Sequence, residues 1–152
     1  MKNLLLAFML IAGFAVANAQ QPKAEFDPEL ANELGADDYG MKSYVLVILK
    51  TGSQVIEDKT IRDSLFAGHM QNISRLADEG KLIVAGPLFA NDNHYRGIFI
   101  LDTDSVELAN EWVQSDPVIR GKVLDADFYK WYGAAALRTY LEVQEKITKI
   151  SF

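Results

Sequence analysis

Apolar side chains recur at helical spacing between Ile61 and Ala77. At about 100° per residue they cover one half of a helix, and polar side chains cover the other half. His69 lies at the middle of the apolar half. An imidazole there needs a hydrogen-bond partner, and beside a cleft it carries protons near neutral pH. The apolar positions are Ile61, Leu65, Phe66, Met70, Ile73, Leu76 and Ala77. The pattern predicts either a pocket around His69 or a core histidine whose hydrogen bonds are satisfied inside the protein.

Four further apolar runs have the length and β-branched content of strands. They lie at 44–49, 81–88, 96–101 and 125–132. Gly80 is expected to end the first helix, and a second helix is expected from its cap Asp104 to the residues before Pro117. A last helix is expected at 137–147. The order βαββαβ plus a helix predicts an α+β fold, a ferredoxin-like sandwich with both crossover helices on one face of an antiparallel sheet.

The second face of this sheet is also rich in Tyr, Val, Ile, Phe and Trp. No other segment of the chain is expected to be long enough to cover it. Exposed apolar sheet faces are normally subunit interfaces, so we expect a homodimer packed sheet to sheet. Trp131, on the last strand, is interpreted as core or interface, with a place in a pocket wall as the alternative.

The N-terminus has the pattern of a bacterial secretory signal. Lys2 precedes an apolar run at 4–16, and Ala17-Asn18-Ala19 has the form of a cleavage site. The run is shorter than the about 20 residues that span a bilayer, although an uncleaved membrane anchor is the alternative. We divide the chain into a signal peptide (1–19), an acidic leader (20–41), the domain (42–134) and a C-terminal helix (135–152). The mature protein is expected to be periplasmic or secreted, free of the membrane.

Composition narrows the classes of partner. The 152 residues include no Cys and carry a formal charge of -6, so disulfides are excluded and nucleic acid is an unexpected partner. Asp92 and His94 have metal-ligand spacing, but two ligands do not make a site. No Gly-rich phosphate loop is present. We expect a small-molecule ligand and no cofactor or metal.

Chain geometry indicates what surrounds His69. Eleven helical residues separate it from Gly80, about 16 Å, which an antiparallel strand covers in about five residues. That distance reaches Gly86-Pro87, a pair that breaks a strand ladder and lets a ligand come close. Asp92 follows on the turn just beyond, where turn chemistry is its simpler role. Arg62 lies seven residues before His69 on the same helical face, and Asp116, before Pro117, is most simply a helix cap.

Several short motifs together resemble the YCII-related (YciI-like) family over about 42–137. The resemblance implies a ferredoxin-like dimer of the dimeric α+β barrel type, with a catalytic His–Asp pair matched here by His69 and Asp92. It also implies small, often aromatic, ligands. Where that family often has a basic residue shortly before the histidine, this chain has Phe66, with Arg62 as the candidate substitute. The motifs are His69, Glu79-Gly80-Lys81-Leu82, Ala85-Gly86-Pro87, the Asp92 turn, Gly97-Ile98-Phe99, Asp116-Pro117 and Trp131-Tyr132-Gly133-Ala134.

Two functions of different class fit these residues. The first is a cofactor-free lyase or isomerase in which His69 moves a proton and Asp92 orients it. The second is a binding or stress-associated module that holds a ligand without turnover. In both, the expected binding residues are Arg62, Gly86, Pro87, Asp116 and Trp131. If His69 serves a site, His69→Leu is expected to keep or raise stability while it abolishes binding.

Overall fold

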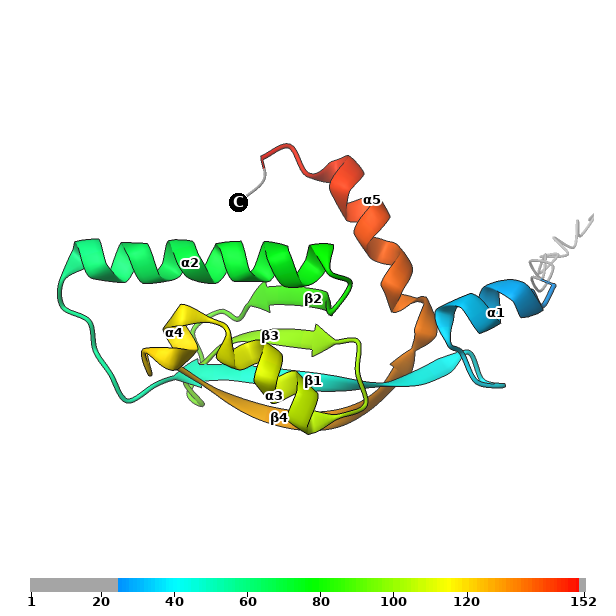
Figure 1. The fold of residues 1–152 in the computed structure, drawn as a ribbon, viewed down its shortest axis with the longest axis horizontal. Coiled ribbons are helices and arrows are strands. Elements are labelled where there is room, and N and C mark those ends of the chain that lie inside the picture. The colour runs from blue at the N-terminus through cyan, green and yellow to red at the C-terminus, as the bar shows by residue number, and fades with distance from the viewer. Residues whose placement is uncertain (1–24, 151–152) are drawn as a thin grey trace, which may run out of the picture.

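The computed structural model describes residues 25–150 of the chain, so the expected signal peptide lies outside the described residues. The elements follow the predicted order, with a short helix before the first strand and another after the second crossover helix (Figure 1). They are α1 (Pro28–Leu34), β1 (Met41–Thr51), α2 (Lys59–Asp78), β2 (Leu82–Pro87), β3 (Tyr95–Leu101), α3 (Val106–Gln114), α4 (Pro117–Arg120), β4 (Leu124–Ala134), the 3-10 helix η1 (Ala135–Thr139) and α5 (Tyr140–Ile147).

The four strands form one antiparallel sheet in the order β2-β3-β1-β4. Val47 of β1 pairs with Phe99 on one side and Phe128 on the other, so these three side chains share a face. Each crossover helix returns the chain to a strand that is not adjacent to the one it left. The arrangement confirms the ferredoxin-like α+β sandwich.

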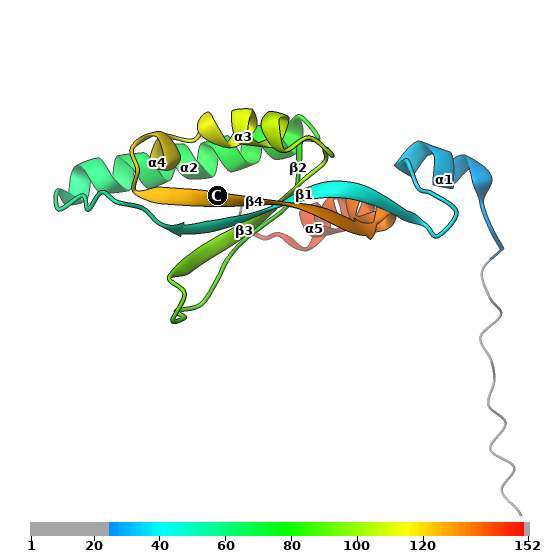
Figure 2. The ribbon, with the colours of Figure 1, turned by 90° about the horizontal axis from the view of Figure 1, so that it is seen from below.

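Helices α2, α3 and α4 lie together on one face of the sheet (Figure 2). The main core fills the space between these helices and the strands. Its members are buried side chains from every one of these elements, which is the condition for a single continuous core. They are Val45, Val47, Leu49, Leu76, Leu82, Phe99, Leu101, Ala109, Val113, Val118, Ile119 and Leu124.

The ends of α2 and α3 are set by caps. Asp58 begins α2 by accepting hydrogen bonds from the backbone of its first turn, and Gly80 ends it with a φ of 68°. The left-handed glycine lets the amide of Lys81 reach the carbonyl of Leu76 at 2.9 Å. The N-cap of α3 is Ser105 and not Asp104, because the Ser105 hydroxyl accepts the amide of Leu108.

The second face of the sheet is partly covered by the C-terminal segment, which corrects the expectation that nothing reaches it. Leu137 and Tyr140 pack against a second apolar cluster around Tyr44. Trp131 belongs to this cluster, with its ring 5.7 Å from that of Tyr44. Tyr129, farther along β4 on the same face, remains 51% exposed. This face is therefore covered at one end and open toward the other.

The acidic leader contains a helix that the sequence analysis did not predict. Asp27 caps α1, which buries none of its residues, so the helix is a solvated element as its acidic composition suggests. Farther along the leader, the Tyr132 hydroxyl donates to the Asp37 carboxylate and ties this segment to β4. Within residues 25–150, no helix has both the length and the apolar character needed to cross a bilayer.

Candidate functional site

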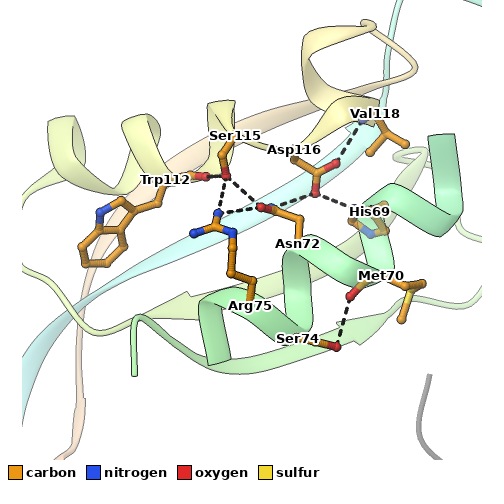
Figure 3. Close-up of polar contacts among 9 residues, drawn as sticks. All are labelled: His69, Met70, Asn72, Ser74, Arg75, Trp112, Ser115, Asp116 and Val118. Atoms are coloured by element: carbon orange, nitrogen blue, oxygen red, sulfur yellow. Dashed lines mark hydrogen bonds and ion pairs between the residues drawn. The ribbon is translucent and has the colours of Figure 1, made fainter. Parts of the chain in front are cut away.

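His69 of α2 pairs with Asp116, the residue that caps the start of α4 (Figure 3). The imidazole projects from the middle of α2, and the carboxylate stands at the turn between α3 and α4. His69 Nδ1 and Asp116 Oδ2 are 2.6 Å apart. Asp116 is fully buried and His69 is 8% exposed. A short contact of this kind between a carboxylate and an imidazole, away from bulk water, fixes the direction in which the ring faces.

The two oxygens of Asp116 have separate tasks. Oδ1 accepts the backbone amide of Val118 at 3.0 Å, which makes Asp116 the cap of α4. Oδ2 accepts from His69 and, at 3.5 Å, from the side-chain amide of Asn72. The cap of α4 is unaffected by this sharing, because the amide of Val118 donates to Oδ1 and the two side-chain contacts use Oδ2. The expected role of Asp116 as a cap is confirmed, and the same residue holds the histidine.

Arg75 and Ser115 form a polar network with the side-chain carbonyl of Asn72. The Arg75 guanidinium donates to Asn72 Oδ1 at 2.8 Å and lies 2.9 Å from Ser115 Oγ. Ser115 Oγ is in turn 2.8 Å from Asn72 Oδ1 (Figure 3). Because Asn72 is buried, these partners satisfy its carbonyl and leave its amide directed at Asp116. The carboxylate is thus held from two sides.

This hydrogen bonding determines the tautomer of His69. A carboxylate only accepts, so Nδ1 carries the proton and Nε2 carries the lone pair. In the described part of the chain Nε2 has no hydrogen-bond partner, and no buried side-chain nitrogen or oxygen there lacks one. Nε2 is therefore exposed to open space, and the open space beside His69 is a pocket. The histidine is neither sealed in the core nor bonded to backbone.

The pocket has a volume of about 660 Å³ and lies between α2 and the sheet. Most of its walls are apolar. Phe99 lies below the imidazole, with the two rings stacked at 6.1 Å, and Phe66 meets the imidazole edge-on at 6.1 Å. Gly86 and Pro87 line the pocket as predicted from chain geometry, and Arg62 lines it as well. A volume of this size suits a small organic ligand.

Asp92 is not part of this site, and the expectation that it orients His69 is wrong. His69 has Asp116 as its partner, and Asp92 does not line the pocket. The β2–β3 connection projects away from the helix layer (Figure 2). Asn91 closes that turn by bonding the backbone of Phe89 and Tyr95. Asp92 is exposed there, in keeping with turn chemistry.

Trp131 lies in the cluster on the opposite face of the sheet, so its place in a pocket wall is excluded and its place in that apolar layer is supported. Arg96 lines the pocket but was not predicted. On a regular strand Arg96 would face the side of the sheet opposite to Gly97, away from the pocket. The β1–β3 pairing is irregular at Arg96, and the sequence carries no signal for that irregularity.

A second hollow of about 470 Å³ lies near the leader. Two pairs of its side chains bond to each other: Lys42 Nζ contacts Asp102 at 2.5 Å, and the Tyr132 hydroxyl donates to Asp37. Among residues 25–150, no three His, Cys, Asp or Glu side chains are grouped to hold a metal ion.

Comparisons with known proteins give a family match and similar solved structures. A model of the YCII-related domain family matches residues 42–131, more than half of the chain. Among solved structures, one similar chain is a 5-chloro-2-hydroxyhydroquinone dehydrochlorinase from Burkholderia phenoliruptrix, determined in complex with 2,5-dihydroxybenzoquinone. It is 17% identical, with a TM-score of 0.42, and the similarity covers 57% of this chain and 92% of that one. No curated protein gives a significant match.

Proposed function

The chain belongs to the family of YCII-related domain proteins, and we propose that it is a cofactor-free enzyme of the lyase or isomerase class. In this proposal His69 moves a proton on a small organic molecule held in the pocket. The observation that carries the proposal is the His69–Asp116 pair, with its free nitrogen at a pocket of about 660 Å³. Asp116 takes the role that the sequence analysis gave to Asp92.

The geometry supports general acid–base catalysis. Nε2 of His69 has the lone pair, so it accepts a proton from an acidic C–H or O–H of the ligand. The resulting imidazolium is stabilised by the Asp116 carboxylate, which keeps its own charge. The same Nε2–H then returns the proton to a neighbouring ligand atom or to a leaving group. A positioned base of this kind contributes about 10²–10⁴-fold to a rate.

The apolar walls assist this chemistry. Phe66 and Phe99 limit the motion of the imidazole and provide flat surfaces for a ring. A ligand that fills the pocket displaces water from Nε2, and charge interactions strengthen when water is excluded. The pocket therefore favours a cyclic or aromatic ligand that presents its reacting carbon to His69.

Solvent exchange tests the proposal without a known product. Small cyclic carbon acids are incubated with the protein in D₂O, and deuterium incorporation at their acidic carbons is followed by NMR. The protein should accelerate exchange for those that bind. His69→Gln and Asp116→Asn should reduce that acceleration by about 10²-fold or more. His94→Gln is the matched control, since His94 is the other of the two histidines and lies on an exposed turn.

A second candidate is a binding module without turnover. It is favoured by one observation, that no Asp, Glu, Cys, Lys or Tyr side chain is among the described residues that line the pocket, so His69 has no second acid–base group of these types beside it there. Ligands that co-purify with the protein distinguish the two functions. A ligand that is released unchanged, with no deuterium gained in D₂O, supports the binding module and contradicts the enzyme.

We also propose that the protein is an exported homodimer. The open part of the second sheet face, with Tyr129 and half-buried Ile48 and Ile98, supports pairing with a second copy. Light scattering should give twice the monomer mass at micromolar concentration, and a stable monomer would contradict the homodimer.

For export, mass spectrometry of the protein from its native host should find Gln20 as the N-terminal residue. An intact Met1 in the cytosol would contradict export.

A further inference from the structure

The described residues that line the pocket include two guanidinium groups and no carboxylate. Arg62 approaches from α2 and Arg96 from β3. The chain as a whole has a formal net charge of -6, so a region with only positive side chains differs from its surroundings. A concave site with charges of one sign attracts small molecules of the other sign.

A β-bulge directs Arg96 to the pocket. Leu49 pairs with Gly97 and Lys50 pairs with Tyr95, so Arg96 is the extra residue in the β1–β3 ladder. On a regular strand Arg96 and Gly97 would face opposite sides of the sheet. At a bulge the extra residue is re-aimed, and here it shares the side of Gly97 and Phe99, which is the pocket side. A local irregularity of the backbone thus places a charge in an otherwise apolar wall.

The guanidinium of Arg96 is tethered but not neutralised. Its Nε donates to Thr51 Oγ1 at 2.7 Å, and Thr51 is itself a pocket residue. No ion pair forms between Arg96 and a carboxylate of the described chain, in contrast to Arg75 and Arg138. Two terminal nitrogens of Arg96 remain available, and a planar guanidinium edge fits a carboxylate in a bidentate manner.

We propose that the ligand of this pocket is a small ring-bearing organic anion, whose carboxylate binds Arg96 while its ring lies near Phe66 and His69. Arg62 adds a second positive charge; its Nη1 donates to the carbonyl of Ile56 at 3.4 Å. The inference rests on the proposed function, because it names the ligand class of the same pocket. The anion anchors the molecule, and the apolar wall selects the ring.

Benzoate and benzamide test this directly, because the two have the same ring and nearly the same shape but differ in charge. Binding is followed by the NMR signals of the His69 ring as each compound is titrated into the purified protein. Benzoate should bind at least about tenfold more tightly than benzamide, the factor that about 1.4 kcal/mol of a charge-assisted bond gives. Added NaCl should weaken benzoate binding and leave benzamide binding unchanged.

Arg96→Gln should abolish the preference for benzoate, so that the variant binds benzoate and benzamide with similar affinity. Arg120→Gln is the matched control, because Arg120 is exposed on α4 and does not line the pocket. Thermal unfolding of each variant verifies that the fold is kept. Equal binding of benzoate and benzamide by the natural protein overturns the inference. So does a preference for benzoate that persists in Arg96→Gln.

The outcome is separable from that of the proposed function. His69→Gln should lose deuterium exchange but keep the benzoate preference, because the anion binds at Arg96; in this variant, binding is followed by the NMR signals of the compounds themselves. A protein that prefers benzoate but exchanges no carbon acid fails only as an enzyme. A protein that exchanges carbon acids through His69 without any preference for anions contradicts only the ligand class.

Discussion

The two halves of α2 carry the same kind of apolar stripe but have different surroundings. In the C-terminal half, Leu76 is 1% exposed and belongs to the main core. In the N-terminal half, Phe66 is 39% exposed and lines the pocket. His69 lies between Phe66 and Leu76; Leu65 before it packs against the main core, and Met70 after it still lines the pocket. An apolar stripe therefore marks a face turned toward the sheet, and it does not tell a packed core from a pocket wall.

The largest expected effect contrasts these halves directly. Leu76→Ala should lower the free energy of unfolding by about 2–5 kcal/mol, since it leaves a cavity in a core that cannot collapse fully. Phe66→Ala should cost less than about 1 kcal/mol, because its ring already faces open space, but it should weaken ligand binding. Chemical denaturation measures the free energy of unfolding of both variants. Similar costs for the two variants would mean that the N-terminal half is packed as tightly as the other.

Substitution of His69, between these two residues, should give the next largest effect on stability. His69→Leu should lower the free energy of unfolding by about 1–3 kcal/mol, because the buried Asp116 acceptor loses its donor. This reverses the expectation from sequence that the change is neutral or stabilising. The double variant with Asp116→Asn should recover part of the loss, since the buried charge is removed while an oxygen remains to cap α4. A His69→Leu protein as stable as the natural one would contradict the pairing.

The smallest expected effect concerns the Tyr132–Asp37 hydrogen bond, which lies outside α2 and does not bear on its two halves. The hydrogen bond from Tyr132 is the main reason that the pKa of Asp37 is lowered from its ordinary 3.8. A lowered pKa adds stability above the unfolded value, and this stability is lost as the pH falls through the folded value. Tyr132→Phe should therefore raise the Asp37 pKa toward 3.8 and alter stability only above that acidic range. Carboxyl ¹³C NMR measures the pKa, and Tyr129→Phe is the control.

Much of the fold was predictable because its signals are local. Strand runs, the Gly80 helix end and the Asp116 cap depend on residues close together in sequence, and the structure confirms them. The cap of α3 was displaced by one residue because Asp104 and Ser105 are both good caps. Chain geometry also placed Gly86 and Pro87 beside His69, since a helix and the strand after it must run back along each other.

The partner of His69 was not predictable in the same way. It is 47 residues away, and the contact depends on how α4 packs against α2. Asp92 looked suitable because it follows the strand beside His69, but the hairpin bends away from the helix layer. Arg96 was missed because the bulge that re-aims it has no distinctive residue pattern. Sequence spacing thus located one wall of the pocket, and packing between distant elements supplied the chemistry.

The protonation of the His69 ring tests the central claim most directly. Long-range ¹H–¹⁵N NMR of the neutral imidazole distinguishes a proton on Nδ1 from one on Nε2, and His94→Gln leaves His69 as the single histidine to observe. The Asp116 contact predicts the proton on Nδ1, with Nε2 unprotonated and shifted when benzoate binds. Asp116→Asn should move the population toward the other tautomer. A proton on Nε2 in the natural protein, or no response of the ring to Asp116→Asn, would contradict the account.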